Sequence, residues 1–334
     1  MIKIGINGLG RIGRRLFRLL SECRDIEVVA VNDLADPETM SHLLRFDSVH
    51  GLWNRSPVVA GDAIVVEDRS IAYCRNAVPA DIPWHKHHID IVFECTGFFK
   101  STVKSAGHLQ KGVRAVILSA PPDDHAIKTV VMGINDHLLT ADDRIVSNAS
   151  CTTNSAAPMV QLVDELCRVK SGYITTVHSY TTDQRLQDAP HRDLRRARAA
   201  AHSIVPTTTG AAKAITRIFP HLDGKLGGCG IRVPVPNGSL TDISYVVEHP
   251  PTVESLNAAF AAAAENRWKG ILQYIEDPVV SADIIGNQHS CIFDAQLTSV
   301  IDHMVKVVGW YDNETGYSAR LIDLARKVMA LQNA

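Results

Sequence analysis

A cysteine and a histidine stand where they could form a nucleophile–base pair. Cys151 lies in SNASCTTNSAAP (147–158), between a β-branched stretch and residues 154–166, which can form a helix. A thiolate at a helix N-terminus has its pKa lowered by the dipole and the unpaired N–H groups. His178 lies near the end of the β-rich run 173–180 and could take the thiol proton. Because the chain has seven cysteines and fifteen histidines, spacing alone leaves open that both are core residues.

The first thirty residues have a pattern that is typical of a ligand-binding unit rather than of a nucleophile. Residues 2–8 alternate isoleucines and end at a glycine, and a pattern with helical periodicity follows. The glycines form Gly8-x-Gly10-x-x-Gly13, and a β-branched stretch then ends at an acid. A strand, this motif, a helix and a second strand in that order predict a dinucleotide-binding βαβ unit.

Each part of this unit has a physical role. The first glycine permits a tight turn, the second lets the backbone approach a pyrophosphate, and the third lets the helix pack on the strand. The N–H groups near Arg11 and Ile12 are expected to face the anion. Asp33, 20 residues after the last glycine, can bond both ribose hydroxyls and would repel a 2′-phosphate. We therefore expect NAD as the cofactor rather than NADP.

The two halves of the chain have different patterns. The first half continues with strand-like stretches at 90–97, 114–121, 129–135 and 144–150. The second half has long β-rich runs at 173–180, 228–249 and 303–313, with amphipathic helices expected at 252–266 and 317–332. We expect an α/β protein: a Rossmann domain over 1–149, completed by a C-terminal helix at 315–334, and an α+β catalytic domain with a mixed or antiparallel sheet over 150–314.

Composition excludes several classes of partner. The net charge of −2 gives no field for nucleic acid or an anionic membrane, and no apolar run reaches a membrane span. The start lacks the pattern of a signal peptide, and the scattered cysteines include no CxxC, so we expect a reduced, cytoplasmic protein. The histidines of WHKHHI (84–89) lack metal-ligand spacing; we interpret them as a solvated turn and expect no metal.

Segments along nearly the whole chain resemble one enzyme family. They are INGLGRIGR, FDSVHG, ECTGFF, SNASCTTN, DLRRARAAA, PTTTGAAKAI, RVPVPN and WYDNETGYS, in the same order. The chain is similar in these segments to the phosphorylating glyceraldehyde-3-phosphate dehydrogenases, NAD-dependent enzymes of glycolysis. The resemblance implies oxidation of glyceraldehyde 3-phosphate to 1,3-bisphosphoglycerate through a hemithioacetal and a thioester. A close relative that oxidises erythrose 4-phosphate is the alternative.

The resemblance also implies roles for individual residues. Cys151 would be the nucleophile and His178 the base. Substrate and inorganic phosphate would be held by Ser150, Thr152, Thr181, Asp183, Arg198, Thr209, Gly210 and Arg232. The NAD site would include Gly8, Gly10, Arg11, Ile12, Gly13, Asp33, Arg75, Thr96, Gly97, Ser119, Asn313 and Tyr317.

Three features bear on assembly and specificity. The arginine-rich run 188–201 is too short, in a chain that is not basic, to predict nucleic-acid binding. The resemblance makes it a loop that lines a neighbouring subunit's cofactor pocket in a homotetramer. Ala189 replaces a bulkier leucine and leaves more room near the ribose, so we expect weak NADP use at most. Gly238 replaces a β-branched residue and is expected to loosen or bend its strand.

Overall fold

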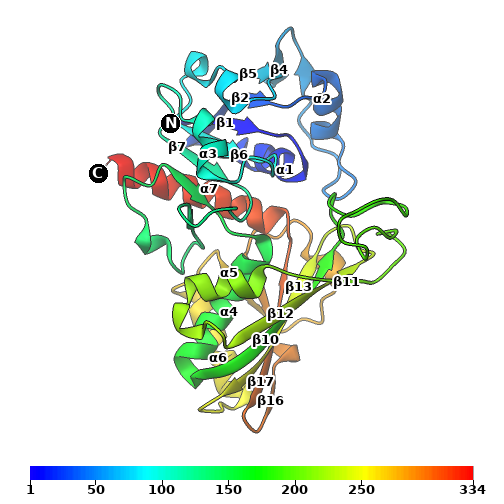
Figure 1. Ribbon diagram of the computed structural model, residues 1–334, viewed down its shortest axis with the longest axis vertical. Helices are drawn as coiled ribbons and strands as arrows, with labels where there is room; N and C mark the ends of the chain where they lie inside the picture. The colour runs from blue at the N-terminus through cyan, green and yellow to red at the C-terminus, as the bar shows by residue number, and fades with distance from the viewer. Residues whose placement is uncertain (334) are drawn as a thin grey trace. The chain divides into compact units, whose positions relative to one another are not determined.

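The computed structural model describes residues 1–333, which divide into two units. The first contains Met1–Val130, Asp136–Ala149 and the residues from Ser318 onward; the second contains Val131–Asn135 and Ser150–Tyr317. These limits differ from the expected ones in residues 131–135 and 315–317. The chain therefore leaves and re-enters the first unit, as Figure 1 shows by its colour sequence.

A nine-stranded sheet forms the first unit, in the order β3-β4-β5-β2-β1-β6-β7-β9-β8. Its strands are β1 (Ile2–Asn7), β2 (Ile26–Asn32), β3 (Val58–Val59), β4 (Ala63–Val66), β5 (Arg69–Cys74), β6 (Ile91–Glu94), β7 (Ala115–Leu118), β8 (Lys128–Thr129) and β9 (Ile145–Ser147). The strands from β5 to β8 along this order are all parallel, while β3 and β4 pair antiparallel at one edge. The fold class is thus confirmed for this half: a parallel sheet connected through helices.

Helices complete the first unit. They are α1 (Arg11–Leu20), α2 (Pro37–Arg45), α3 (Thr102–Ser105), the 3-10 helices η1 (Pro79–Asp81), η2 (Trp84–His87), η3 (Ala106–His108) and η4 (Asp136–Leu138), and most of α7 (Thr315–Asn333). The side chain of Asp36 caps α2 by accepting the Thr39 N–H. Late in α7, Arg326 pairs with Asp25 at 2.7 Å, which ties the end of the chain to its beginning.

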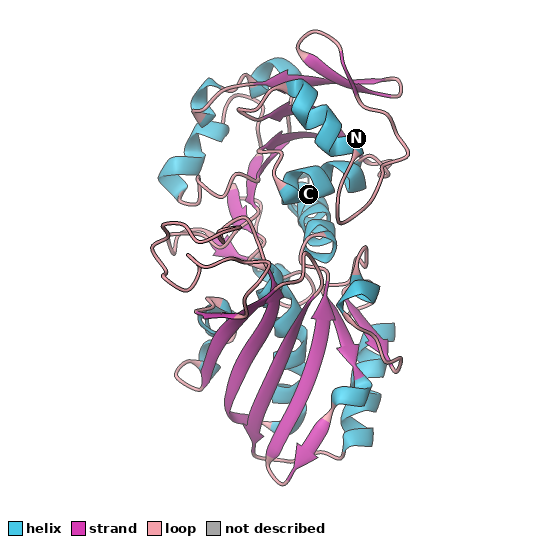
Figure 2. Cartoon of the chain, turned by 90° about the vertical axis from the view of Figure 1, so that its right-hand side faces the viewer, coloured by secondary structure: helices cyan, strands magenta, loops and turns pink. Residues whose placement is uncertain are grey.

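An eight-stranded sheet forms the second unit, in the order β11-β12-β10-β13-β17-β15-β14, with β16 paired to β17. Its strands are β10 (Val169–Ser179), β11 (Val205–Thr207), β12 (Leu226–Val233), β13 (Ser239–Val247), β14 (Leu272–Ile275), β15 (Cys291–Asp294), β16 (Ser299–Ile301) and β17 (Met304–Tyr311). Parallel and antiparallel pairs both occur, so the sheet is mixed as expected. Figure 2 shows its long strands side by side.

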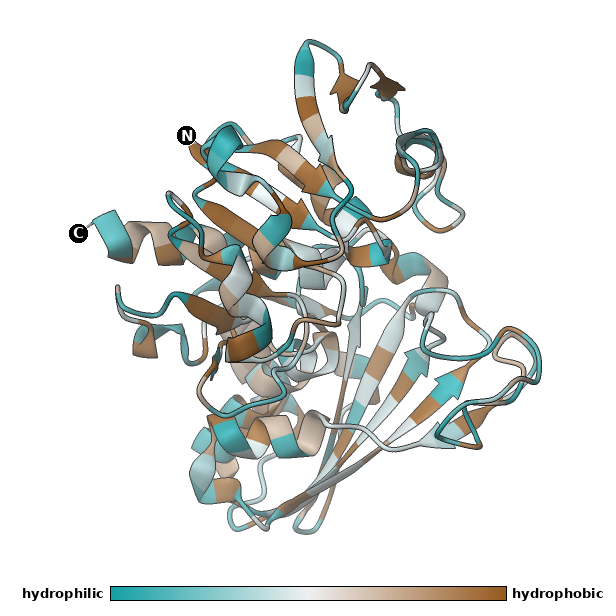
Figure 3. Cartoon of the chain, turned by 45° about the horizontal axis from the view of Figure 1, so that its top comes forward, coloured by the Kyte–Doolittle hydropathy of each residue, from teal (hydrophilic) through white to brown (hydrophobic). Residues whose placement is uncertain are grey.

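The helices of the second unit are α4 (Cys151–Cys167), α5 (Ala211–Ile218), α6 (Val253–Glu265) and the 3-10 helices η5 (Pro220–Leu222), η6 (Ser281–Ile284) and η7 (Ala295–Leu297). α4 packs on β10, β13, β15 and β17, and hydropathy alternates along these strands (Figure 3). Thr252 and Ser255 form a capping box at the start of α6. Phe260 and Phe293 stack with ring centroids 3.8 Å apart in the core.

Two segments differ from the sequence-based expectation. The strand expected over 129–135 is reduced to β8, because the chain turns at Gly133, which has a φ of +80° and faces Trp268 and Ile271. The antiparallel strands β3 and β4 were not predicted, because they have only two and four residues. In WHKHHI, residues Trp84–His87 form the 3-10 helix η2, with Trp84 fully buried. Among the residues described, no helix has the length and apolar character to span a bilayer.

Candidate active site

Cys151 is the first residue of α4 in the second unit. Ser150 has extended backbone and its hydroxyl accepts the Thr153 N–H at 3.1 Å, which caps the helix. Pro158 lies inside this helix, where it has no N–H to donate to the preceding turn. The capping serine therefore fixes where the helix begins and places the thiol in its first turn.

The geometry brings Cys151 and His178 together. Cys151 Sγ lies 3.4 Å from His178 Nε2, with His178 at the end of β10 and 5% exposed. Burial raises the pKa of the Cys151 thiol, whereas the Arg232 charge and the Thr152 N–H and hydroxyl lower it, and the net shift is upward. Burial, and then the Arg232 charge, lower the pKa of His178 to about 3. The pair is neutral at neutral pH in the ligand-free chain.

This result corrects one expectation about the thiol. The helix N-terminus was expected to lower the pKa of Cys151, and the N–H groups of Thr152 and Cys151 do act in that direction. They are outweighed because the sulfur is withdrawn from water, which disfavours the charged form. Activation of the thiol therefore needs a change in the charges around it, and the charge that acts on it is that of Arg232.

Arg232 lies against the other face of the histidine. It is on β12, which pairs in parallel with β10 so that Arg232 is directly opposite His178. Its guanidinium contacts His178 Nδ1 at 2.7 Å and donates to the Ser179 carbonyl at 2.9 Å. His178 Nδ1 also lies 2.7 Å from that carbonyl. The imidazole is thus held by main chain and cation on one side and faces the thiol on the other.

Tyr311, which sequence reasoning missed, supports the same pair. Its hydroxyl lies 2.9 Å from both Thr152 Oγ1 and Thr176 Oγ1, and its ring meets the His178 ring edge-on at 5.9 Å. Burial and the neighbouring Cys151 raise the pKa of this phenol, so it stays neutral. Only the pairing of β17 with β13 brings Tyr311 here, and no sequence signal marks it beyond its place before the DNE motif.

Three of the expected phosphate-binding residues, Thr209, Gly210 and Asp183, lie between β10 and α5. Thr209 and Gly210 lie at the start of α5, where the Thr209 hydroxyl accepts the Ala211 N–H at 3.2 Å. Asp183 pairs with Arg196. That arginine also donates to Thr207 Oγ1 at 3.0 Å.

The structure therefore places Arg196, and not Arg198, beside Thr207 and Thr208. Arg196 further donates to the Thr208 carbonyl at 3.3 Å. Arg198 instead pairs with Asp188 at 2.9 Å, and both of these side chains are exposed. The two arginines are separated by one residue in a loop without regular structure, so the sequence alone could not distinguish them. Thr181 lies in the same loop.

Two hydrogen bonds fix the orientation of the Asn313 side-chain amide. Its Oδ1 accepts hydrogen bonds from Ser179 Oγ and Ser239 Oγ, both at 2.8 Å. Because the oxygen is already engaged by two donors, the amide nitrogen is the group able to donate to a carboxamide oxygen. Tyr317 follows in the first turn of α7 and is 5% exposed. Ser179 and Ser239 were not predicted, since they converge from two strands.

Gly238 precedes β13 and has a positive φ of +86°. A Cβ there would lie 2.3 Å from the Ser281 carbonyl oxygen. The Gly238 N–H donates to Asn237 Oδ1 at 2.9 Å, which fixes the turn that delivers Ser239 to Asn313. The expectation of a bend is met by this turn, and a β-branched residue would be strained here.

Gly238→Ala is expected to lower the free energy of unfolding by roughly 3 kcal/mol, from strained backbone and steric overlap together. It should also weaken NAD binding, because Ser239 would shift from Asn313. Urea unfolding and NAD titration measure the two effects. Gly224→Ala is the control: it has a φ of +73° but nothing within 4 Å of its Cβ position, so it should cost about 1 kcal/mol. Equal losses in both variants would contradict the steric account.

The glycine loop of the first unit has the geometry its three positions require. Gly8 has a φ of +94°, and a Cβ at Gly13 would lie 2.0 Å from the Gly8 carbonyl oxygen. A Cβ at Gly10 would meet nothing within 4 Å, so this face is open for a ligand. Gly10 caps α1, whose N-terminal N–H groups at Arg11 and Ile12 suit an anion. These features fit a dinucleotide pyrophosphate.

Charged residues flank this loop. Asp33 accepts the Leu9 N–H at 2.7 Å, which joins the end of β2 to the loop. Arg75 donates to the Leu34 carbonyl at 3.1 Å, one residue beyond that acid. Arg11 pairs with Asp47 at 2.6 Å; although burial raises the pKa of this carboxyl, the arginine and two N–H groups hold it well below its usual range.

The remaining expected cofactor residues lie at the ends of neighbouring strands. Thr96 and Gly97 follow β6, and Gly97 has a φ of +74°. Ser119 follows β7, and its N–H donates to the Glu94 carbonyl at 2.9 Å. The carboxyl ends of parallel strands meet at one edge, so these residues share it with Asp33.

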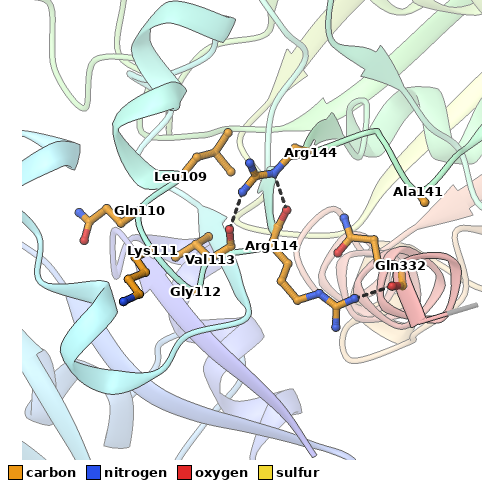
Figure 4. Close-up of a pocket in the computed structure, with 9 residues that line it drawn as sticks. All are labelled: Leu109, Gln110, Lys111, Gly112, Val113, Arg114, Ala141, Arg144 and Gln332. Carbon is orange, nitrogen blue, oxygen red and sulfur yellow. Dashed lines mark hydrogen bonds between the residues drawn. The ribbon is translucent and has the colours of Figure 1, made fainter.

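A separate hollow of about 620 Å³ in the first unit is not part of this edge. Figure 4 shows that it is lined by residues 109–114, Ala141, Arg144 and Gln332. Arg144 donates to the Val113 carbonyl and Arg114 to the Gln332 carbonyl, both at 2.7 Å. The Arg114 guanidinium thus braces the end of α7, while Arg144 braces the segment before β7.

Comparison with known proteins identifies the family. Residues 2–102 match the glyceraldehyde 3-phosphate dehydrogenase NAD binding domain, and residues 150–313 match the C-terminal domain of the same family. Curated relatives named glyceraldehyde-3-phosphate dehydrogenase come from Mycobacterium avium, 51% identical over 98% of both chains, and Priestia megaterium, 49% identical over 98% of both. Glyceraldehyde-3-phosphate dehydrogenase 2 of Streptomyces avermitilis is 49% identical over 97% of both. The chain belongs to the glyceraldehyde-3-phosphate dehydrogenase family and is an NAD-dependent dehydrogenase.

Proposed function

We propose that this chain oxidises D-glyceraldehyde 3-phosphate to 1,3-bisphosphoglycerate through a covalent intermediate on Cys151. The observation that carries the proposal is the 3.4 Å contact between Cys151 Sγ and His178 Nε2, with Arg232 on the opposite ring nitrogen. A thiol, a base and an adjacent cation suit nucleophilic attack on the carbonyl of an anionic substrate.

The substrate's phosphate is proposed to activate the pair. Burial, and after it the Arg232 charge, lower the pKa of His178, so an anion that neutralises this charge would raise that pKa and favour transfer of the thiol proton to the imidazole. The Cys151 sulfur then adds to the aldehyde carbon and forms a hemithioacetal. Its oxyanion would be held by the Cys151 N–H and His178, where loss of one such donor typically costs about 3 kcal/mol.

NAD is proposed to bind at the glycine loop of the first unit. When bound, NAD accepts the hydride that the substrate carbon loses. Asn313 would donate its amide N–H to the carboxamide, and Asp33 would accept from the ribose hydroxyls. The oxyanion would first take the thiol proton back from His178 to become the hemithioacetal hydroxyl. His178 would then remove that proton as the hydride leaves, which gives a thioester on Cys151. The Ala189 position gives more room near the ribose, so residual NADP use is part of the proposal.

Inorganic phosphate is proposed to complete the reaction. Ser150, Thr152, Thr209 and Gly210 offer hydroxyl and N–H groups, and Arg196 stands beside the adjacent threonines. A phosphate oxygen attacks the thioester carbon, the C–S bond breaks, and the Cys151 thiolate leaves as the acyl phosphate forms. The substrate's own phosphate would lie near Thr181, Asp183 and Arg232.

Phosphate dependence tests this proposal. NADH formation with glyceraldehyde 3-phosphate and NAD should continue only when phosphate or arsenate is present, and should stop after about one turnover per site without them. Sustained turnover in their absence would refute the phosphorylating route. Erythrose 4-phosphate is the comparison substrate, and an equal rate with it would refute the assigned aldehyde.

We further propose that the chain acts as a cytoplasmic homotetramer. The loop between β10 and β11 has no helix or strand over residues 180–204 and exposes Leu186, Leu194 and Ile204. Large apolar side chains gathered on an exposed loop are typical of an interface. In a homotetramer this loop would line the cofactor pocket of a neighbouring subunit.

A further inference from the structure

A chain of buried polar side chains connects three neighbouring strands of the first unit where those strands end. Asn7 ends β1 and is in register with Asn32 of β2 on one side and Glu94 of β6 on the other. Asn32 Nδ2 donates to Asn7 Oδ1 at 2.8 Å, and Asn7 Nδ2 donates to Glu94 Oε2 at 2.6 Å. All three side chains are at most 3% exposed. Such groups are costly to bury unless each is satisfied.

Glu94 is the acceptor at which the hydrogen bonds of this series of side chains meet. Its Oε1 accepts the Thr96 N–H at 2.7 Å and also the Thr96 hydroxyl. Its Oε2 accepts from Asn7 and lies 3.0 Å from His108 Nε2. Only an ionised carboxylate can accept from all of these donors at once.

A hydrogen bond from Trp84 determines which ring nitrogen of His108 carries the proton. Its indole N–H, which can only donate, points at His108 Nδ1 at 3.0 Å. Nδ1 must therefore be unprotonated, so the single ring proton is on Nε2 and is donated to Glu94. His108 is then neutral, and the charge of Glu94 is stabilised by hydrogen bonds rather than by a cation.

Each side chain of this hydrogen-bonded series lies beside a residue of the cofactor edge. Gly8 follows Asn7, Asp33 follows Asn32, and Thr96 is bonded twice to Glu94. Gly8 is also packed against Thr96, since a Cβ on it would lie 2.9 Å from both Thr96 N and Thr96 Cγ2. A shift of Thr96 would therefore be transmitted directly to the glycine loop.

We propose that Glu94 is the positioning residue of the dinucleotide site: hydrogen-bonded to Asn7, Thr96 and a neutral His108, it holds Thr96 against the Gly8 turn and so sets the affinity for NAD. The proposal deepens the cofactor site described above and rests on it. Glu94 touches no reacting atom, so its effect should appear in cofactor binding and not in the chemical step.

Glu94→Gln tests the proposal with the shape of the side chain preserved. The glutamine amide would turn two N–H donors toward either Thr96 or the Asn7 and His108 donors, so one set must move apart. We expect NAD to bind about tenfold more weakly by calorimetry. The kcat at saturating NAD and the KM for glyceraldehyde 3-phosphate should stay within about twofold. Unchanged NAD affinity in this variant would overturn the proposal.

Asp90→Asn is the matched control. Asp90 precedes the same strand at its other end and accepts the Lys3 N–H at 2.8 Å. It should lower the melting temperature while NAD affinity stays as in the wild type. A similar loss of NAD affinity in both variants would show that general destabilisation is the cause.

Two further measurements test the proposal even if Glu94→Gln does not fold. Thr96→Val removes one donor to Glu94 and should weaken NAD about threefold; wild-type affinity would contradict the proposed path through Thr96. Nitrogen-15 NMR of the wild type should show His108 as the neutral Nε2–H tautomer, and a protonated ring would overturn its assigned state. If the wild type itself bound no NAD, the cofactor site and not only the role of Glu94 would be refuted.

Discussion

Cys151→Ser is expected to abolish aldehyde oxidation, with a loss of kcat/KM on the order of 10,000-fold or more. A serine hydroxyl is a far weaker nucleophile than a thiol, and the neighbouring His178, with a pKa of about 3, cannot ionise it. NAD should bind to the variant as to the wild type, because the glycine loop and Asp33 lie in the other unit and Asn313 is positioned by Ser179 and Ser239 rather than by the thiol. NADH production and calorimetric titration measure the two properties.

Cys229→Ser is the control for this prediction. Cys229 lies on β12 in the same unit, partly buried, with its sulfur 3.9 Å from Thr175 Oγ1. Replacement there should leave the rate within about twofold, since no contact joins it to His178. Full activity of Cys151→Ser, or an equal loss in both variants, would refute the assignment of the nucleophile.

His178→Gln is expected to lower kcat by roughly 1,000-fold, within the usual range for loss of a general base. The amide side chain fills similar space but cannot accept the thiol proton. Its KM values should change less than kcat, because neither the cofactor edge nor Thr209 and Gly210 depend on the ring. Pre-steady-state NADH formation measures the step directly. A rate near that of the wild type would show that His178 is not the base.

The same variant should also change acid stability. The folded-state pKa of His178 is about 3, below its unfolded value of 6.5, so the unfolded chain binds the proton more readily. Stability is therefore fully present above pH 6.5 and is lost as pH falls toward 3. Between neutral pH and pH 5 this one group accounts for about 2 kcal/mol. His178→Gln should flatten the fall in unfolding free energy by that amount; an unchanged slope in urea titrations would contradict the burial argument.

Several features follow from local sequence because their physical cause is local. The glycine loop needs a positive φ at Gly8 and no Cβ at Gly13, requirements of a single turn. The start of α6 needs only Thr252 and the residues after it. The second unit's long strands have alternating hydropathy that shows their faces. In each case the relevant atoms lie within a few residues of one another.

Other features were missed because distant residues decide them. Residues 131–135 look like a strand, but packing of Gly133 against Trp268 turns the chain. Arg196 and Arg198 have the same chemistry, and only the fold of their loop directs one to Asp183 and the other to Asp188. Short edge strands such as β3 have too few residues to produce a pattern.

The sequence by itself determined the family, the class of each domain and the cofactor, and it predicted the nucleophile with its base. It could do so because motifs such as SCTTN and the glycine fingerprint encode local geometry and residue chemistry together. Only the tertiary structure decided that the thiol and imidazole are neutral in the ligand-free chain, that Arg232 lies on the histidine, and that Glu94 with His108 supports the cofactor edge. Protonation and charge depend on burial and on groups brought from other strands, which are properties of the folded chain.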